Sequence, residues 1–299
     1  MWAITVTAII VLIVLLCLLL AVPLVKRHPF KECHSPTEFG LAHEAVSFST
    51  NDGIILRGYW IPSFGSTRTV VMLHGYAGSL DPDLKYTPHL HSAGYNILLF
   101  DFRAHGRSAG KITTMGALER ADVKSAVEVA RKHGSTWIAL LGFSMGGRAA
   151  ILSAPQIPEV AAVISDGAPA RLSTAATQDL HLRGLPLPLA ALLSRMMLLG
   201  ASILSGVNLF TEDPIHQAGK LRGIPILFIN GEQDLYITRD EIEKMVHDAG
   251  PLASLWSVPE AKHRNIEVTR PQEYLQRILS FLQTQSNNSQ HHGEVYETH

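Results

Sequence analysis

The chain has 299 residues, with 25 Lys and Arg against 26 Asp and Glu and a formal net charge of -1. This length is enough to bury a large core in one domain, and the balanced charge without a basic stripe argues against DNA or RNA as a partner. The two cysteines, Cys17 and Cys33, have no partner in the globular part, which excludes a disulfide framework but leaves the redox compartment open.

The amino-terminal segment Trp2–Val25 carries no charge and consists mostly of Ile, Val, Leu and Ala. As a helix it measures about 36 Å, enough to cross a hydrocarbon core of about 30 Å. We therefore expect residues 1–25 to form an uncleaved, single-pass membrane anchor. A cleaved signal peptide and a buried core helix are the alternatives. A signal peptide would place its basic residues before a shorter apolar stretch, whereas here they follow it.

The basic residues Lys26, Arg27 and Lys31 come directly after this run. Because such residues favour the cytoplasmic side of a membrane, we expect the globular domain there. Residues 26–43 are polar and irregular, which predicts a solvated juxtamembrane linker. Its His and Cys residues match no standard zinc spacing; they are His28, Cys33, His34 and His43.

Eight strands are expected along the rest of the chain. Residues 44–50 and 54–61 flank a turn of Asn, Asp and Gly and predict a hairpin. The other six are short apolar runs, typical of a parallel sheet that is covered on both faces. They are residues 69–73, 96–100, 137–142, 161–165, 224–230 and 253–258.

Helical stretches alternate with these strands. They are residues 82–92, 115–132, 145–154, 239–248 and 271–284. A hairpin followed by alternating strands and helices predicts an α/β domain over residues 44–284, with a mostly parallel eight-stranded sheet, right-handed crossovers and helices on both faces. Ligands are expected at the carboxyl ends of the strands. The polar residues 285–299 are expected to be a disordered tail.

One interval of nearly sixty residues breaks this alternation. It separates the strand that ends near Ser165 from the one that begins at Ile224, and it is rich in Leu, Met and Ala. We expect residues 166–222 to form a helical cap that lines an apolar substrate pocket. The alternative is an ordinary packing helix with long connections.

The segment 142–147, Gly-Phe-Ser-Met-Gly-Gly, joins a predicted strand to a predicted helix. A serine on such a sharp turn has strained backbone geometry, so glycines are needed where backbones approach closely. Ser144 is therefore our candidate nucleophile. The amide of Met145 opens the helix and points to where negative charge would develop on a reacting carbonyl oxygen.

A serine hydroxyl needs a base to accept its proton. His263 follows the last strand at the same edge of the sheet, and the pKa of histidine suits proton transfer near neutral pH. A carboxylate should then fix the imidazole tautomer. Asp234, directly after the strand 224–230, is our prediction, and Asp166, after the preceding strand, is the alternative.

An oxyanion site needs a second amide besides that of Met145. The segment 74–78, His-Gly-Tyr-Ala-Gly, follows the third strand and brings the backbone N–H of Tyr76 to the expected edge. The role belongs to the backbone of Tyr76 and not to its phenol.

These motifs together resemble the α/β-hydrolase superfamily over residues 44–284. The resemblance rests on His74-Gly75, the segment 101–108, the elbow 142–147, Gly231-x-x-Asp234 and the late His263. Within that superfamily the chain resembles the serine-hydrolase branch of esterases, lipases and related peptidases, because position 144 is serine and not the aspartate of haloalkane dehalogenases. The resemblance implies that Asp101 and His105 shape a loop and that His74 is structural or pocket-lining.

The implied activity is hydrolysis of a carboxylic ester through a Ser-His-Asp triad and an acyl-enzyme. The substrate would be a small-molecule or lipid-like acyl ester, with thioesters and amides as alternatives, and no cofactor or metal is expected. There are two competing hypotheses. One is an inert membrane-tethered binding or scaffold protein, and the other is an acyltransferase with the same triad. No sustained heptad specifies an oligomeric state.

Overall fold

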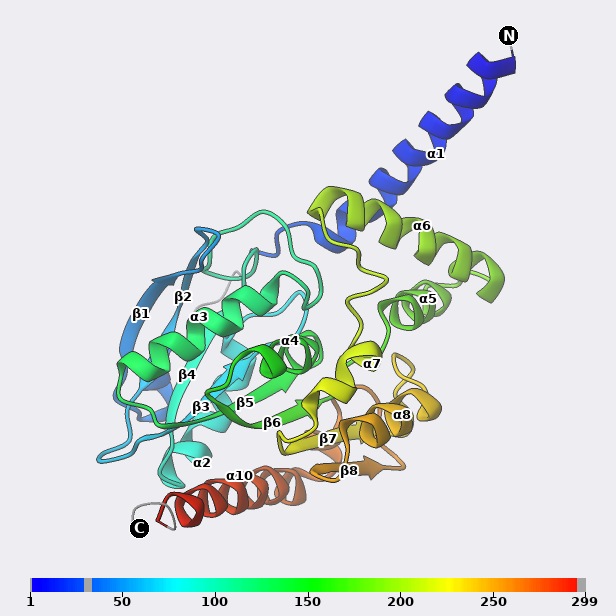
Figure 1. Ribbon diagram of the computed structural model, residues 1–299. Coiled ribbons are helices and arrows are strands. Elements are labelled where there is room, and N and C mark those ends of the chain that lie inside the picture. The colour runs from blue at the N-terminus through cyan, green and yellow to red at the C-terminus, as the bar shows by residue number, and fades with distance from the viewer. Residues whose placement is uncertain (1, 30–33, 295–299) are drawn as a thin grey trace.

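The computed structural model describes residues 2–29 and 34–294 (Figure 1). Its strands form one eight-stranded sheet in the order β1-β2-β4-β3-β5-β6-β7-β8. The strands are β1 (Glu44–Ser49), β2 (Ile55–Ile61), β3 (Arg68–Leu73), β4 (Asn96–Asp101), β5 (Trp137–Phe143), β6 (Val160–Asp166), β7 (Ile226–Gly231) and β8 (Ala253–Val258).

The sheet confirms the predicted architecture. The pairs β1–β2 and β2–β4 are antiparallel, and the remaining five pairs are parallel. Every predicted strand forms, with ends that differ by at most two residues. Strands β4 and β5 are buried along their whole length, as expected for near-continuous apolar runs between two layers of helices.

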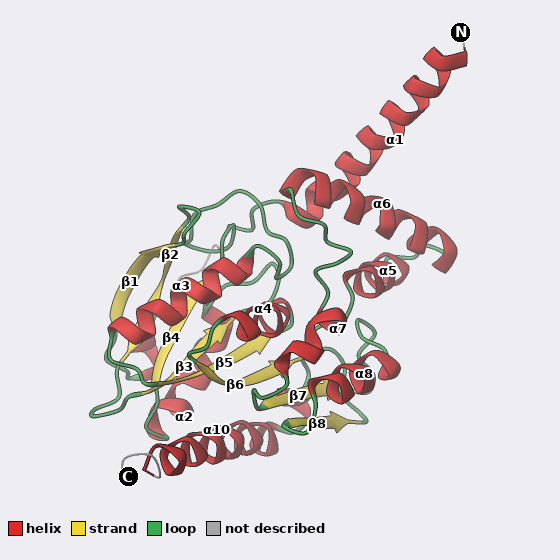
Figure 2. Ribbon diagram, viewed as in Figure 1, coloured by secondary structure: helices red, strands yellow, loops and turns green. Residues whose placement is uncertain are grey.

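Helices cover both faces of the sheet (Figure 2). One apolar core lies under α3 (Glu119–Lys132), α4 (Met145–Ser153) and α8 (Arg239–Ala249). A second core lies under α2 (Thr87–Ser92) and α10 (Pro271–Glu294). Short helical segments complete the described part of the domain. They are Pro36–Phe39, Asp81–Tyr86, Ala154–Gln156, Ala218–Leu221 and α9 (Ile266–Thr269).

The last helix, α10, corrects the prediction of a disordered tail from residue 285. It continues to Glu294 without interruption. Ser286 is buried and accepts a hydrogen bond of 3.4 Å from the Arg68 guanidinium, and its hydroxyl lies 3.3 Å from that of Tyr95. Polar contacts with the domain therefore hold this turn of the helix, although the segment lacks apolar periodicity. Residues 295–299 lie outside the described part of the chain.

The long insertion between β6 and β7 contains the α-helices α5 (Leu172–Leu182), α6 (Leu187–Ser205) and α7 (Pro214–Gln217), followed by the short 3-10 segment Ala218–Leu221. Its two ends are anchored on α4 by the fully buried Arg148. The guanidinium donates to the Pro169 carbonyl at 2.8 Å and to the Glu212 carbonyl at 3.0 Å, and it pairs with Asp213 at 3.2 Å. A buried Arg can satisfy this many acceptors because it carries five donors in a fixed plane.

Helix α1 (Trp2–Val25) projects away from the domain, and α6 lies across its inner half (Figure 1). Within the described residues, these two helices are long and apolar enough to cross a membrane. The inner half of α1 contributes Cys17, Ala21 and Val25 to the buried core, whereas the side chains described between Trp2 and Leu16 are exposed.

The predicted solvated linker after α1 is wrong for residues 26–29, which pack on the domain. Arg27 donates hydrogen bonds to the carbonyls of Gly106, Ser108 and Gly110, and Lys26 and His28 form β-bridges with Ile112 and His105. The guanidinium thus supplies donors to three backbone carbonyls of the loop 106–110, which explains why this polar segment does not stay in solvent. Lys31 and Cys33 lie outside the described residues.

Candidate active site

Ser144 lies at the tight turn between β5 and α4, with φ of 51° and ψ of -108°. This is an unfavourable conformation for a residue with a side chain. Two neighbouring glycines make the turn possible. A Cβ on Gly142 would lie 2.4 Å from the Gly146 carbonyl oxygen, and a Cβ on Gly146 would lie 1.9 Å from that of Leu73. The packing of α4 against β3 and β5 therefore requires glycine at both positions.

Three of the predicted site residues form a chain of hydrogen bonds. The Ser144 hydroxyl lies 3.0 Å from Nε2 of His263, and Nδ1 of His263 lies 2.7 Å from a carboxylate oxygen of Asp234. Since an ionised carboxylate only accepts, Nδ1 carries the proton and Nε2 is free to accept from the serine. This is the tautomer that a general base for Ser144 needs.

The loops that carry Asp234 and His263 pack against each other. A Cβ on Gly231 would lie 2.3 Å from the Ala261 carbonyl oxygen, so the end of β7 meets the loop after β8 at backbone contact. The amide of Gln233 donates to that same carbonyl at 2.9 Å. Asp234 also accepts from the amide of Tyr236 at 2.8 Å, which fixes its carboxylate plane. These contacts explain the short distance to His263.

Asp166, the alternative acid, does not contact His263. Its carboxylate accepts a hydrogen bond from Tyr274 at 2.6 Å and forms an ion pair with Arg264. Its carbonyl accepts from the amide of Ser144 at 2.8 Å, so the residue supports the turn at Ser144 through its backbone. Arg264 also lies 3.5 Å from Asp83, whose pKa burial raises to about 7.

The oxyanion-site prediction involves Tyr76 and Met145. Met145 is the first residue of α4, and the first amides of a helix have no partner within it. Tyr76 lies in the loop after β3, where a Cβ on Gly75 would lie only 3.6 Å from Cβ of Ser144. His74 supports this loop, because Nδ1 lies 2.7 Å from the Gly75 carbonyl oxygen while Nε2 accepts from the amide of Phe102 at 2.9 Å.

Both ring nitrogens of His74 therefore bond to backbone groups, which agrees with the structural role that the resemblance implied. Burial lowers its pKa to about 4, so it is neutral near pH 7 and keeps a proton on one nitrogen only. With Nε2 accepting, the proton is on Nδ1 and is donated to the Gly75 carbonyl.

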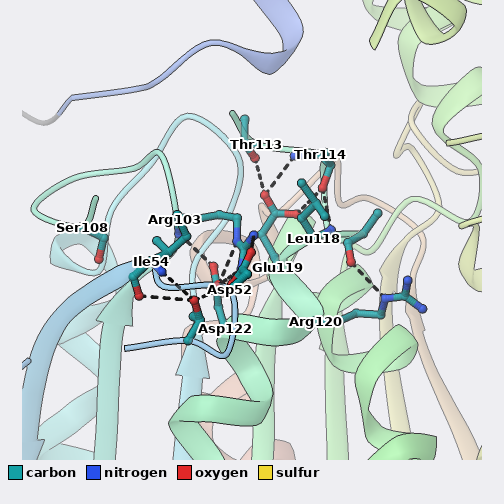
Figure 3. Close-up of polar contacts among 12 residues, drawn as sticks. Asp52, Ile54, Arg103, Ser108, Thr113, Thr114, Leu118, Glu119, Arg120 and Asp122 are labelled. Carbon is teal, nitrogen blue, oxygen red and sulfur yellow. Dashed lines mark hydrogen bonds and ion pairs between the residues drawn. The ribbon is translucent and has the colours of Figure 1, made fainter. Parts of the chain in front are cut away.

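A polar network missed by the sequence interpretation supports the loop 113–116 beside the site (Figure 3). The fully buried carboxylate of Glu119 accepts from Thr113 and Thr114 and from the amide of Gly116 at 2.7 to 2.9 Å. Burial alone would raise the pKa of Glu119, but these hydrogen bonds outweigh it and lower the pKa. The carboxylate fixes the position of Met115, which lines the cavity above Ser144.

Arg103 pairs with Asp122 of α3 and with Asp52 in the turn after β1, at 2.7 Å each (Figure 3). Arg103 and Asp122 are buried, whereas Asp52 is half exposed, so this network joins α3 to the hairpin and is not part of the site. The partners of Arg103 lie 19 and 51 residues away in the chain, so no sequence pattern marked this network. The partners of Glu119 lie only three to six residues before it, but they form no recognised motif.

A cavity of about 600 Å³ lies above Ser144 and His263. Its volume falls in the range of small-molecule sites. Apolar side chains from α1, α5 and α6 form most of its wall. They are Leu19, Leu20, Leu24, Leu172, Ala175, Ala176, Leu180, Leu193, Met197 and Leu198. Polar groups are few at this wall, and they are Asp179, Arg183, Tyr76 and Tyr236. Across the described residues, no three or more His, Cys, Asp or Glu side chains are grouped to hold a metal ion.

Comparisons with known proteins agree with the fold. A family model described as the alpha/beta hydrolase fold matches residues 68–192. The uncharacterized protein YfhR of Escherichia coli O157:H7 is 26% identical over 250 residues, which cover 80% of each chain. The uncharacterized protein YqkD of Bacillus subtilis is 23% identical over 253 residues, which cover 80% of this chain and 78% of YqkD.

Among solved structures, the esterase Pf2001 of Pyrococcus furiosus superposes with a TM-score of 0.73 at 27% identity, over 87% of this chain and 97% of the esterase. The sheet order, the family model and this neighbour support a hydrolase. The chain belongs to the α/β-hydrolase superfamily.

Proposed function

We propose that the protein is a membrane-anchored serine hydrolase that cleaves carboxylic esters with apolar acyl groups. The observation that carries this proposal is the chain of hydrogen bonds from Ser144 through His263 to Asp234, with distances of 3.0 and 2.7 Å, at the floor of an apolar cavity. The likeness to an esterase over most of the chain supports it independently.

In the proposed mechanism, the Ser144 oxygen attacks the ester carbonyl while Nε2 of His263 accepts the serine proton. Asp234 stabilises the imidazolium through Nδ1, and the amides of Tyr76 and Met145 stabilise the oxyanion. The imidazolium then donates its proton to the leaving alcohol, which gives an acyl-enzyme. Water, activated by the same histidine, releases the acid and restores the serine.

Membrane anchoring through α1 is part of the proposal. Its exposed apolar residues from Trp2 to Leu16 would be unfavourable in water. Lys26 and Arg27 follow, so the domain is proposed to face the cytoplasm. Protease protection in sealed vesicles tests the orientation, since digestion of the domain only from the non-cytoplasmic side would contradict it.

A fluorophosphonate probe, which traps activated serines, tests the catalytic part on the membrane-bound protein. We expect labelling of wild type and of the remote control Ser63→Ala, and none of Ser144→Ala. Folded wild type that resists the probe would contradict the proposal and favour an inert scaffold. Product analysis with added alcohol acceptors then separates hydrolysis from acyl transfer.

A further inference from the structure

The helices α1 and α6 cross at backbone contact. A Cβ on Gly200 of α6 would lie 2.0 Å from the Cys17 carbonyl oxygen, and Cys17, Ala21 and Ala201 are fully buried beside it. Small residues at a crossing let two helices approach closely and fix their relative position. If α1 crosses a membrane, the depth of α6 in that membrane is therefore fixed by the depth of Cys17 in α1.

This crossing leaves too little of α1 free to cross a membrane alone. Residues 2–16, the part beyond the crossing, measure about 22 Å as a helix, whereas a hydrocarbon core is about 30 Å thick. The remaining part of the hydrocarbon core, about 8 Å, must be crossed by the part of α1 that begins at Cys17, which packs against α6. This distance is close to the depth to which helices lying in a membrane surface are buried, about 5–10 Å.

The outer face of α6 suits such a position. Its exposed side chains are mostly apolar. Arg195, the one charged residue in the sequence of the helix, is also exposed, and its long side chain can extend to place the guanidinium at the interface between membrane and water. Thinning the bilayer to match the length of residues 2–16 would cost free energy for each ångström of mismatch. Immersing α6 in the bilayer instead removes apolar surface from water, which is favourable. The exposed apolar residues of α6 are Leu187, Leu189, Leu192, Leu199, Ile203 and Leu204.

We infer that α6 lies within the membrane leaflet nearest the domain, and that the active-site cavity takes its substrate, a bilayer lipid ester, from that leaflet. This inference rests on the proposed anchoring and hydrolase function and adds the substrate class. Leu20 and Leu24 of α1 and Leu193 and Met197 of α6 line the cavity that reaches Ser144. An acyl chain can thus pass between immersed helices to the serine without crossing water.

The polar side of the cavity indicates where the rest of the lipid would lie. Asp179 and Arg183, at the end of α5, line the cavity and form an exposed ion pair of 2.8 Å. Exposed, paired charges are compatible with the interface between membrane and water but not with the acyl-chain region. We place the polar part of the lipid beside them and its acyl chain against α1.

The depth of α6 can be measured on the full chain in vesicles of phosphatidylcholine and phosphatidylglycerol. An environment-sensitive fluorophore is attached at Leu199→Cys or Ile203→Cys, in a chain whose own cysteines are replaced by Ala. Matched sites are Leu12→Cys on free α1 and Phe64→Cys, whose side chain is fully exposed on the domain. Quenching by lipids brominated on the acyl chain is compared with quenching by aqueous iodide.

We expect lipid quenching at positions 12, 199 and 203 and iodide quenching at position 64. Iodide quenching at 199 and 203 with lipid quenching at 12 would overturn the inference while leaving the anchor intact. Absence of lipid quenching at 12 would overturn the anchoring and the inference together. The fluorophosphonate test stays separate, because it reports on Ser144 whatever the depth of α6.

A second measurement tests the wall of the cavity. Leu19→Trp enlarges a residue that lines the cavity, and Leu12→Trp is its matched control on the same helix. We expect Leu19→Trp to lower hydrolysis of a long-chain glycerophospholipid in vesicles about tenfold relative to a short, soluble ester. The control should change neither rate. An equal effect on both esters, or none, would contradict the role of α1 in the acyl site.

Discussion

The hydroxyl of Tyr76 lies 2.9 Å from the carbonyl oxygen of Leu24 and 3.1 Å from that of Pro23, so it donates to the last turn of α1. Burial raises the pKa of Tyr76 to about 12, which keeps the hydroxyl protonated at physiological pH. The backbone amide of the same residue is the proposed oxyanion donor. One residue thus connects α1, the proposed membrane anchor, to the loop that would bind the reacting carbonyl.

Tyr76→Phe keeps the backbone amide and removes this tether. A buried hydrogen bond contributes about 1 kcal/mol, and the freed carbonyls lose their donor. We expect about a threefold to tenfold fall in kcat/KM for a long-chain ester, with fluorophosphonate labelling retained. Tyr59→Phe, whose hydroxyl bonds to the His34 carbonyl away from the cavity, is the control. A loss of labelling in Tyr76→Phe would mean that the phenol itself serves the chemistry.

Asp234→Asn and Asp166→Asn separate the two candidate acids. Asn at 234 favours the wrong imidazole tautomer, so kcat should fall by about 10⁴ with little change in fold. Asn at 166 instead deprives Arg264 of its nearest carboxylate, which should lower the free energy of unfolding by roughly 1–3 kcal/mol. The kcat of the folded Asp166→Asn enzyme should stay within about tenfold of wild type. Steady-state kinetics alongside denaturant unfolding would expose a reversed order.

Gly200→Ala tests the crossing of α1 and α6. The added methyl would lie 2.0 Å from the Cys17 carbonyl oxygen, so the two helices must separate. We expect a lower melting temperature and an altered preference among acyl-chain lengths, because the wall of the cavity moves. Gly219→Ala is the matched control, because its Cβ would have no neighbour closer than 3.9 Å. Equal melting temperatures for both variants would contradict a close crossing.

Acid should destabilise the fold through buried histidines. Burial lowers the pKa of His74 and of His105 to about 4, whereas the unfolded value is about 6.5. Between these values the unfolded chain binds more protons, so the free energy of unfolding falls as the pH drops from 7 towards 4. By pH 5 each histidine should account for about 2 kcal/mol.

The variant His105→Gln removes one of these titrating groups. Its free energy of unfolding should fall less between pH 7 and 5 than that of wild type, whereas the exposed control His247→Gln should follow wild type. Urea unfolding in detergent at the two pH values measures both slopes. Parallel slopes for wild type and His105→Gln would show that this ring does not take up a proton on unfolding in that range.

The order of strands and helices was predictable because each element carries its own local signal. Apolar runs marked the parallel strands, and the glycines around Ser144 marked the turn. Asp234 and Asp166 could not be separated with the same certainty, since both follow strands at the same edge. The partly buried Arg264, which forms an ion pair with Asp166, comes from a loop nearly one hundred residues later and was not recognised.

The errors at the two ends of the domain have a common physical cause. Residues 26–29 and 285–294 are mostly polar in sequence. A polar segment remains in solvent only when the folded domain offers it no hydrogen-bond donors or acceptors. Arg27 donates hydrogen bonds to three backbone carbonyls, and Ser286 forms hydrogen bonds with Arg68 and Tyr95. Such partners come from distant segments, so composition alone cannot reveal them.

Removal of α1 would affect more than location. Trimming the chain before Lys26, by a protease in the cell or for expression in soluble form, would uncover Leu198 and Ala201, which pack with Ala21 and Val25 of α1, and would open the cavity on one side. Ser144, His263 and Asp234 would be untouched. A trimmed enzyme should therefore still react with small, soluble esters but lose selectivity for acyl length, and a substrate screen on that form would describe a different specificity from that of the intact protein.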